Sequence, residues 1–271
     1  MKKLTLILPI LGLAATGLSS CNNANVIRVG ATPTPHSEVL KSKIVQDYIA
    51  NAGYKLKVVV YQDYKTPNKA LNDGGIDANY FQHIPYLEGE VEEFGYKITA
   101  VAKVHCEPLS LYSKTPIEDF TNKTINIISD LTNLERALAL LKSHEIIDTY
   151  TMDNFNTLHP ENNYTSSKNV TIKCIDEGLL TNKVEDGGYA VIPGNFALTK
   201  WGVDKAVQYS LFSETAEQAG EKANIIAART KDVGTTKINV LCDALAQPAL
   251  ADFFTANYGP AVLYSYVNLV N

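Results

Sequence analysis

The sequence has little of several features that mark particular classes of protein. It contains 4 cysteines and 1 tryptophan in 271 residues, and 24 Lys and Arg are outnumbered by 29 Asp and Glu. Neither a basic block nor a low-complexity tract is present, so nucleic-acid binding is not expected and bulk disorder is excluded. With 45% apolar and 20% charged residues, the composition is that of a globular protein. The length predicts two domains, each large enough to bury a core without disulfides.

Long apolar runs are also missing, except at the N-terminus. Two lysines there precede an uncharged, mostly apolar stretch at 4–18, and two serines then lead to Cys21. The stretch is shorter than the roughly 20 apolar residues that a membrane-spanning helix needs, and Pro9 interrupts it. Residues 1–20 are therefore predicted to be a signal peptide.

Cys21 ends a Leu-Ser-Ser-Cys string that resembles the bacterial lipobox, in which the cysteine is acylated and becomes the first residue of the mature protein. Residues 21–25 would then be a lipidated cysteine and a short polar tether. Two or more acyl chains anchor a protein stably, whereas one is marginal. The sequence predicts a lipoprotein of the bacterial cell envelope, anchored to a membrane and facing the periplasm or the exterior. An ordinary signal peptide that ends beside a cysteine is the alternative.

The remaining cysteines are Cys106, Cys174 and Cys242. An odd number allows at most one intramolecular disulfide. Each lies beside apolar residues, which favours buried free thiols that pack as small hydrophobic groups. None has the CxxC spacing of a zinc or redox site.

Strand and helix patterns alternate along the first part of the chain. Apolar, β-branched runs predict strands at 26–31, 55–61, 76–80 and 98–105. Helical spacing of apolar residues predicts helices at 36–52, 68–72 and 82–94. This order is typical of a mostly parallel sheet covered by helices.

A polar segment at 114–123 predicts a passage into a second α/β unit, and another at 213–222 predicts the return. A long surface loop is expected at 153–168. The predicted strands are 124–128, 170–175, 189–192, 206–212 and 224–229, and the predicted helices are 134–142, 178–184 and 195–201. The tail is predicted to be helical at 237–258, with an interruption near Pro248, and extended at 261–266.

The predicted fold class is therefore α/β, with two lobes joined by two crossings. Lobe I comprises residues 26–117 and 223–271, and lobe II comprises residues 118–222. In this arrangement a ligand binds in the cleft between the lobes, outside the carboxyl ends of the strands.

Aromatic and polar residues concentrate after the strands of lobe I. An aromatic ring taken alone is often part of a core, but these rings lie beside an imidazole and a carboxylate on three loops. The concentration favours a binding site. The candidates are Tyr64, Phe81, His83, Tyr86 and Glu107.

Lobe II offers an arginine near the start of the predicted helix at 134–142. Thr132 and Glu135 have the spacing of a capping box, and the apolar stripe of the helix leaves Arg136 off the core face. A guanidinium beside the exposed N–H groups of a helix start favours a carboxylate. A solvated surface arginine is the alternative.

Two asparagines accompany this arginine. Asn133 lies in the same turn, and Asn195 follows the strand predicted at 189–192. A carboxamide donates and accepts hydrogen bonds at once, so both are candidates for contact with a polar ligand group.

Five strings of the chain carry a family resemblance. They read VGATPTPHSEVL at 29–40, DANYFQHIPYLE at 77–88, VHCEPLSLYS at 104–113, TNLERAL at 132–138 and GNFA at 194–197. In their order and spacing, from residue 26 to the C-terminus, the chain resembles the NlpA-type substrate-binding lipoproteins of methionine ABC importers. The FQHxPYL string is the most specific of the five.

The resemblance implies a type II periplasmic binding protein fold that closes on L-methionine and docks on an ABC importer permease and its ATPase. An aromatic pocket suits methionine, because a thioether gains roughly 0.3–1.5 kcal/mol from contact with a ring. An arginine on the opposite lobe meets the ligand only when the cleft closes. By resemblance, Tyr64, Phe81, His83 and Tyr86 line the side-chain pocket, Arg136 binds the carboxylate, Asn133 and Asn195 hold the polar end, and Glu107 orients the ammonium group or supports the site.

The chain departs from the family pattern at the rim of the expected cleft. Pro193 stands where family members carry asparagine, and the segments 129–133 and 153–168 match poorly. The ligand is therefore less closely defined than the fold. A methionine-containing dipeptide, another apolar amino acid or a metal ion are the alternatives.

The metal alternative depends on side chains that zinc or manganese accepts as ligands. No pair of them has a tight spacing such as HxxxH, so a metal site is not the preferred interpretation. The side chains are His36, His83, His105 and Glu107.

Enzymatic activity is not expected. Cys106 and His105 are neighbours on a predicted strand and so point to opposite faces, which argues against a thiol–imidazole pair. The chain has no GxSxG, HExxH or P-loop string. We therefore expect no catalytic residue, no cofactor and a monomer. An adhesive role beside ligand binding is compatible with the sequence.

Overall fold

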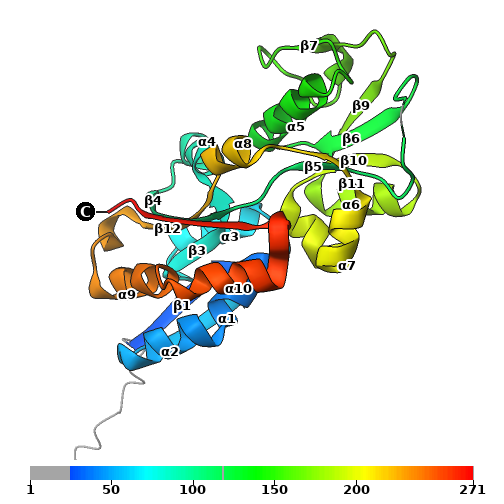
Figure 1. Cartoon of the computed structure of the whole chain (residues 1–271). Helices are drawn as coiled ribbons and strands as arrows, with labels where there is room; N and C mark the ends of the chain where they lie inside the picture. Colours follow the sequence, from blue (N-terminus) through cyan, green and yellow to red (C-terminus); the bar gives the residue numbers. More distant parts are fainter. Residues whose placement is uncertain (1–24, 118, 271) are drawn as a thin grey trace, which may run out of the picture.

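The structure is a computed structural model that describes residues 25–117 and 119–270. It contains two α/β lobes, each built on its own sheet (Figure 1). The predicted fold class is therefore confirmed. The predicted signal peptide and Cys21 lie outside the described residues. Within the described ranges, no helix has both the length and the hydropathy needed to cross a bilayer.

Lobe I is built on a six-stranded sheet in the order β13-β4-β12-β3-β1-β2. Its strands are β1 (Val26–Ala31), β2 (Lys55–Val60), β3 (Ala78–His83), β4 (Ile98–Cys106), β12 (Asn224–Arg229) and β13 (Leu263–Asn268). β1 is parallel to β2 and β3, whereas β12 is antiparallel to both of its neighbours, β3 and β4. The carboxyl ends of β1 to β4 therefore share one edge of the sheet, and β12 begins at that edge.

Helices cover both faces of this sheet. Ile225 and Ala227 of β12 belong to an apolar cluster that includes residues of α3 and α4, whereas Ile226 and Ala228 belong to the cluster on the other face. This division follows from the alternation of side chains along a strand. The helices are α3 (Lys65–Asn72) and α4 (Ile84–Phe94) on one face, and α1 (Glu38–Lys41), α2 (Lys43–Asn51), α9 (Thr236–Leu245) and α10 (Ala249–Tyr258) on the other.

The single helix predicted at 36–52 is broken. A π-helical turn at Pro33–Ser37 leads into α1, and Ser42, with φ −58° and ψ 148°, separates α1 from α2. The Ser42 hydroxyl accepts a hydrogen bond from the N–H of Val45 and so caps α2. His36 consequently lies in the turn, where its ring packs edge-on against Tyr80 of β3.

Lobe II is built on a five-stranded sheet in the order β11-β5-β10-β6-β9. Its strands are β5 (Ser110–Tyr112), β6 (Thr124–Ile128), β9 (Thr171–Ile175), β10 (Tyr189–Ile192) and β11 (Ser210–Ser213), and its helices are α5 (Leu131–Ser143), α6 (Glu177–Glu185) and α7 (Gly194–Tyr209). β6 is parallel to β9 and β10, whereas β5 is antiparallel to β10 and β11.

Two predictions for lobe II are wrong in detail. The segment 206–212 is not one strand, because α7 continues to Tyr209 after a kink at Gly202 (φ 72°). Glycine adopts this left-handed conformation without steric cost. The loop predicted at 153–168 contains part of a short ribbon of β7 (Thr149–Tyr150) and β8 (Tyr164–Thr165).

The chain passes twice between the sheets, and the two passages lie side by side. Because β5 already belongs to the sheet of lobe II, the first passage lies at 107–109, ahead of the boundary that the sequence predicts at 117. The second passage runs from 214 to 223 and contains α8 (Ala216–Glu221). The N–H of Glu214 donates to the carbonyl of Leu109 at 2.9 Å.

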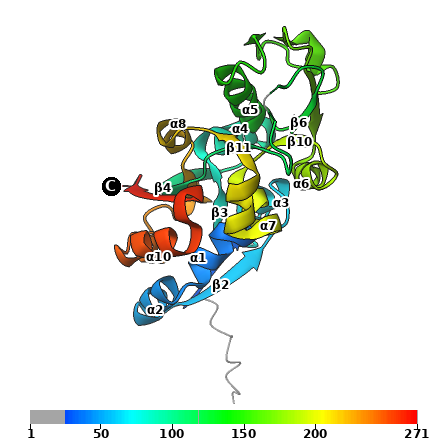
Figure 2. The same ribbon diagram turned by 45° about the vertical axis from the view of Figure 1, so that its right-hand side comes forward.

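The two lobes are in contact. Leu180 and Val184 of α6 and Leu198 of α7 belong to the same apolar cluster as residues of lobe I. α7 also packs on the Pro33–Ser37 turn (Figure 2). The cleft predicted between the lobes is therefore narrow in this structure.

The three cysteines are free thiols, as predicted. Cys106 and Cys242 are buried, and Cys174 is half-buried on β9. Burial raises the pKa of all three, to about 11 for Cys174 and about 12 for Cys242. They therefore carry little thiolate at neutral pH and behave as small apolar side chains.

Candidate functional site

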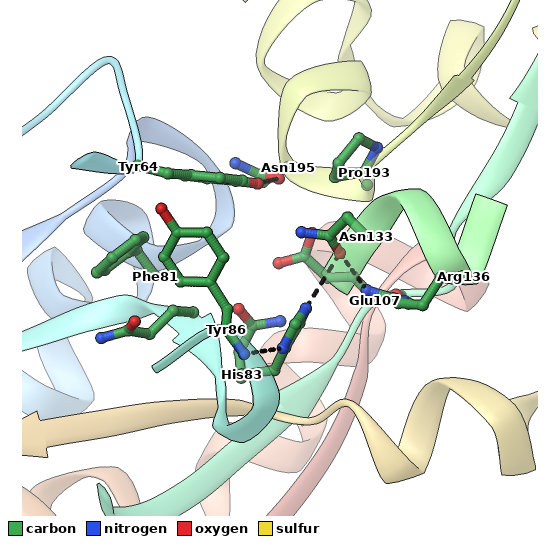
Figure 3. Close-up of a pocket in the computed structure, with 12 residues that line it drawn as sticks. Tyr64, Phe81, His83, Tyr86, Glu107, Asn133, Arg136, Pro193 and Asn195 are labelled. Atoms are coloured by element: carbon green, nitrogen blue, oxygen red, sulfur yellow. Dashed lines mark hydrogen bonds between the residues drawn. The ribbon is translucent and has the colours of Figure 1, made fainter. Parts of the chain in front are cut away.

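One pocket between the lobes gathers all eight residues proposed from the sequence as ligand contacts (Figure 3). Their roles in binding stay a prediction, but their convergence from both lobes is a feature of the structure. The side chains nearly fill the pocket: the cavity that remains has a volume of about 20 Å³, which is room for about one water molecule. Its lining residues are Tyr64, Phe81, Gln82, His83, Tyr86, Glu107, Asn133, Arg136, Pro193, Gly194, Asn195 and Asn224.

Three aromatic rings of lobe I form one wall of the pocket. Tyr64 precedes α3, Phe81 lies on β3 and Tyr86 lies in the first turn of α4. The ring centre of Tyr64 is 5.7 Å from that of Phe81 and 5.7 Å from that of Tyr86. The rings are tilted or edge-on to one another, an arrangement that aromatic pairs favour. The result is a buried wall with polarizable faces.

His83 connects this wall to lobe II. Its Nδ1 accepts a hydrogen bond from the N–H of Tyr86 at 3.2 Å and so caps α4. Since Nδ1 is an acceptor, the ring proton is on Nε2, which donates to Asn133 Oδ1 at 3.0 Å. Burial and the nearby charge of Arg136 lower the pKa of His83 to about 3. The neutral imidazole therefore bridges the lobes.

Asn133 lies at the start of α5, but the predicted capping box is wrong. Asp130, and not Thr132, caps the helix, because its carboxylate accepts a hydrogen bond from the N–H of Asn133 at 3.0 Å. The Asn133 amide also donates to Asp130 at 3.1 Å. These bonds orient Asn133 Oδ1 toward His83 and Arg136.

Arg136 is buried and already paired with a carboxylate of the protein. Only 9% of its side chain is exposed, so the alternative of a solvated arginine is wrong. Nε and Nη2 bind the carboxylate of Glu214 at 2.9 and 2.6 Å. Nη1 donates to Asn133 Oδ1 at 3.0 Å, and Nη2 also donates to the carbonyl of Glu107 at 3.3 Å. These contacts with described residues use every guanidinium proton except one on Nη1, which can therefore bind a ligand.

Glu107 lies at the first passage and joins a buried hydrogen-bonded network. Its Oε1 is 2.8 Å from His105 Nε2 and 3.5 Å from His36 Nε2. The second nitrogens of these rings bond to Tyr80 and to Thr32. Burial raises the pKa of Glu107, and the charge of a protonated His36 opposes this shift.

This network contains three of the four side chains of the metal alternative. The donor atoms of His36, His105 and Glu107 lie within 4.8 Å of one another, but His83 is not part of the group. Every buried side-chain nitrogen or oxygen in the described ranges has a hydrogen-bond partner. The network is thus complete from the side chains alone, which favours a structural role for it.

The N-terminus of α7 closes the pocket from lobe II. A Cβ atom on Gly194 would stand 2.9 Å from Glu107 Oε2, so glycine allows the carboxylate to approach the positive end of the helix. The next residue, Asn195, accepts a hydrogen bond from the Tyr64 hydroxyl at 2.7 Å. Tyr64–Asn195 and His83–Asn133 are thus two direct side-chain bonds between the lobes.

The contacts proposed from the sequence leave out four lining residues, Gln82, Pro193, Gly194 and Asn224, of which Pro193 was placed at the rim of the cleft. Asn224 is the first residue of β12, and its Oδ1 bonds to His36 Nε2 at 3.1 Å. The sequence could have indicated Asn224 by its position just after the return passage. A strand antiparallel to its neighbours begins at the edge of the sheet where those neighbours end. Gln82 is held by Asn68 and Asn79, and no sequence pattern indicates those contacts.

The three buried histidines make stability dependent on pH. Burial lowers the pKa of His36 to about 4 and those of His83 and His105 to about 3. Unfolded histidines titrate near 6.5, so the folded state excludes protons that the unfolded state takes up. We expect full stability above about pH 6.5 and a loss of up to about 4 kcal/mol per pH unit as the pH falls toward 4. Glu107, with its raised pKa, offsets part of this loss near the acidic end.

Urea unfolding between pH 7.5 and 5 measures this slope. His36→Asn removes one of the three buried imidazoles and should flatten this slope by about one proton. A free energy of unfolding that is constant over this range would contradict the burial of neutral imidazoles.

Two α/β lobes that enclose a pocket lined from both sides define a substrate-binding protein. In agreement, the solved structure of a periplasmic substrate-binding protein of an ABC transporter from Coxiella burnetii superposes with a TM-score of 0.78 at 28% identity. The match covers 88% of this chain and 100% of that chain.

The chain belongs to the NlpA lipoprotein family, whose model matches residues 27–265. It is 33% identical to the methionine-binding lipoprotein MetQ of Bacillus subtilis, over 97% of this chain and 98% of that protein. A nutrient-binding protein from Burkholderia cenocepacia, solved bound to methionine, has a TM-score of 0.76 at 28% identity and covers 88% of this chain and 99% of that chain. The family resemblance of the five strings is therefore confirmed.

Proposed function

We propose that this protein captures L-methionine, or a close analogue, between its lobes and delivers it to an ABC importer. One observation carries the proposal: an aromatic wall on lobe I faces polar groups on lobe II across a single pocket. We further propose that Cys21 carries the lipid that holds the protein at the membrane. The role is substrate binding rather than catalysis, in keeping with the family.

The chemistry of the two sides suits an apolar amino acid. A thioether side chain gains contact energy against Tyr64, Phe81 and Tyr86. The remaining Nη1 proton of Arg136 is a donor for the carboxylate, and Glu107 is an acceptor for the ammonium group. One end of the pocket is thus apolar and the other carries both signs of charge.

Closure of the lobes is part of this proposal. The aromatic wall belongs to lobe I, whereas Arg136, Asn133 and Asn195 belong to lobe II, so only the closed form offers all contacts together. A ligand that touches both sides favours closure by its differential affinity for the closed form. Support for the ligand class comes from MetQ of Bacillus subtilis and from the methionine-bound Burkholderia protein.

A panel of ligands tests the proposal. Protein unfolded and refolded to remove any bound ligand is titrated with L-methionine, D-methionine, methionine sulfoxide, norleucine, a glycyl-methionine dipeptide and zinc. A ligand that binds at 100 times its Kd stabilises the fold by about 2.7 kcal/mol, which thermal unfolding detects. We expect the largest rise in Tm with L-methionine and a smaller one with norleucine, which lacks the sulfur. A larger rise with the dipeptide or with zinc would reassign the ligand.

A further inference from the structure

Glu214 does not line the pocket, yet its carboxylate is the main partner of the only arginine that does. Only 7% of its side chain is exposed. It lies directly after β11, at the start of the second passage. A buried carboxylate needs several donors to offset the loss of its hydration. This one binds Arg136 Nε, Arg136 Nη2 and the N–H of Leu109.

The contact with Leu109 links Glu214 to the first passage as well. Its Oε2 accepts the N–H of Leu109 at 2.9 Å, and its own N–H donates to the carbonyl of Leu109 at 2.9 Å. The two chain segments that connect the lobes are therefore joined at one residue, and the same carboxylate holds Arg136 of α5.

The geometry of the pair fixes which edge of the guanidinium faces the pocket. Glu214 occupies the edge formed by Nε and Nη2, and Nη1 remains on the side of Asn133 and the pocket. A free arginine side chain loses rotamer entropy when it is fixed. A guanidinium already held by a two-point contact loses less of it when the ligand binds.

We propose that Glu214 is the positioning residue of Arg136: it holds the guanidinium in the orientation that presents Nη1 to the ligand carboxylate. This inference rests on the proposed function, in which Arg136 meets that carboxylate. A different effect of Glu214, neutralisation of the positive charge, would have the opposite sign. If neutralisation dominated, loss of the carboxylate would strengthen the binding of an anionic group.

Two substitutions and two ligands distinguish these effects. Glu214→Gln removes the charge and one acceptor, and Glu214→Asp keeps the charge but shortens the side chain by one methylene, so that it cannot reach all three donors. The ligands are L-methionine and L-methioninol, which lacks the carboxylate. We expect both variants to bind L-methionine at least about tenfold more weakly, and L-methioninol within about threefold of the wild type. Glu217→Gln, three residues further on and exposed, is the matched control and should change neither affinity.

A measurement without ligand tests the same role. The Nε–H of Arg136 should give a slowly exchanging NMR signal in the wild type, absent in Glu214→Gln and retained in Glu217→Gln. An equal loss of affinity for both ligands, tighter binding of L-methionine or an unchanged Nε–H signal in Glu214→Gln would each overturn the inference. Failure of the wild type to bind L-methionine would contradict the proposed function, whereas the Nε–H signal would still decide the role of Glu214.

Discussion

An Arg136→Met variant is expected to bind L-methionine at least about 100-fold more weakly than the wild type, as measured by isothermal titration calorimetry. The substitution keeps an unbranched apolar stem but removes all the N–H donors of the guanidinium, including the Nη1 proton proposed to bind the carboxylate. Hydrogen bonds to charged groups contribute about 1.5–3 kcal/mol, and 100-fold corresponds to about 2.7 kcal/mol. Equal affinity in the two proteins would refute the assigned role of Arg136.

The same variant leaves Glu214 buried without its partner. The resulting loss of stability must be separated from the effect on affinity. Removing one member of a buried ion pair costs about 3–5 kcal/mol of stability. The double variant Arg136→Met/Glu214→Leu removes both charges, so we expect it to recover stability in urea unfolding without recovering affinity. Recovery of both would show that Arg136 acts only on folding.

A Gly194→Ala variant is expected to lose about tenfold to 100-fold in affinity for L-methionine. The new Cβ would stand 2.9 Å from Glu107 Oε2 and 3.1 Å from Glu107 Cβ. Glu107 is itself held by His105, so relief requires that α7 move away from lobe I. Overpacking of this kind costs about 1–3 kcal/mol. This cost applies to the closed form, in which the two residues meet, so affinity falls with the closed fraction.

Gly89→Ala is the matched control for this substitution. Gly89 lies in α4, is exposed, and has no atom within 4 Å of its would-be Cβ. Alanine there should leave affinity unchanged and stabilise the helix by up to about 1 kcal/mol. Calorimetry and thermal unfolding of both variants check the pair. Wild-type affinity in Gly194→Ala would mean that α7 does not need this close approach.

The elements that could be predicted from the sequence are those with a strong local pattern. Apolar runs such as Val26–Ala31 and Tyr189–Ile192 form strands with the predicted bounds. Predictions failed where a competing local contact decides the outcome. Asp130 caps α5 in place of Thr132, since its carboxylate reaches the N–H of Asn133. Gly202 allows α7 to continue past a kink.

The candidate site was predictable where its residues follow strands, because strand ends define the cleft. The charge pairing within the site was not predictable. The partner of Arg136 lies 78 residues away along the chain, and no spacing rule connects them. The burial of Arg136 follows from that pairing, whereas the sequence pattern placed the arginine only off the core face of its helix and left a solvated surface arginine as the alternative. Glu214 reaches Arg136 because the second passage brings the two residues together in the fold. Local periodicity in the sequence does not encode such a contact.

The position of β12 between β3 and β4 has a consequence for the order of synthesis. β3 and β4 are consecutive strands in the chain, yet they cannot pair directly in the finished sheet. The strand that fills the gap is translated only after all of lobe II. Lobe I therefore stays an open, incomplete sheet on the ribosome, whereas lobe II is a continuous segment that can fold as soon as it emerges. For a chain predicted to be exported, this order delays the stable core until translation is nearly complete.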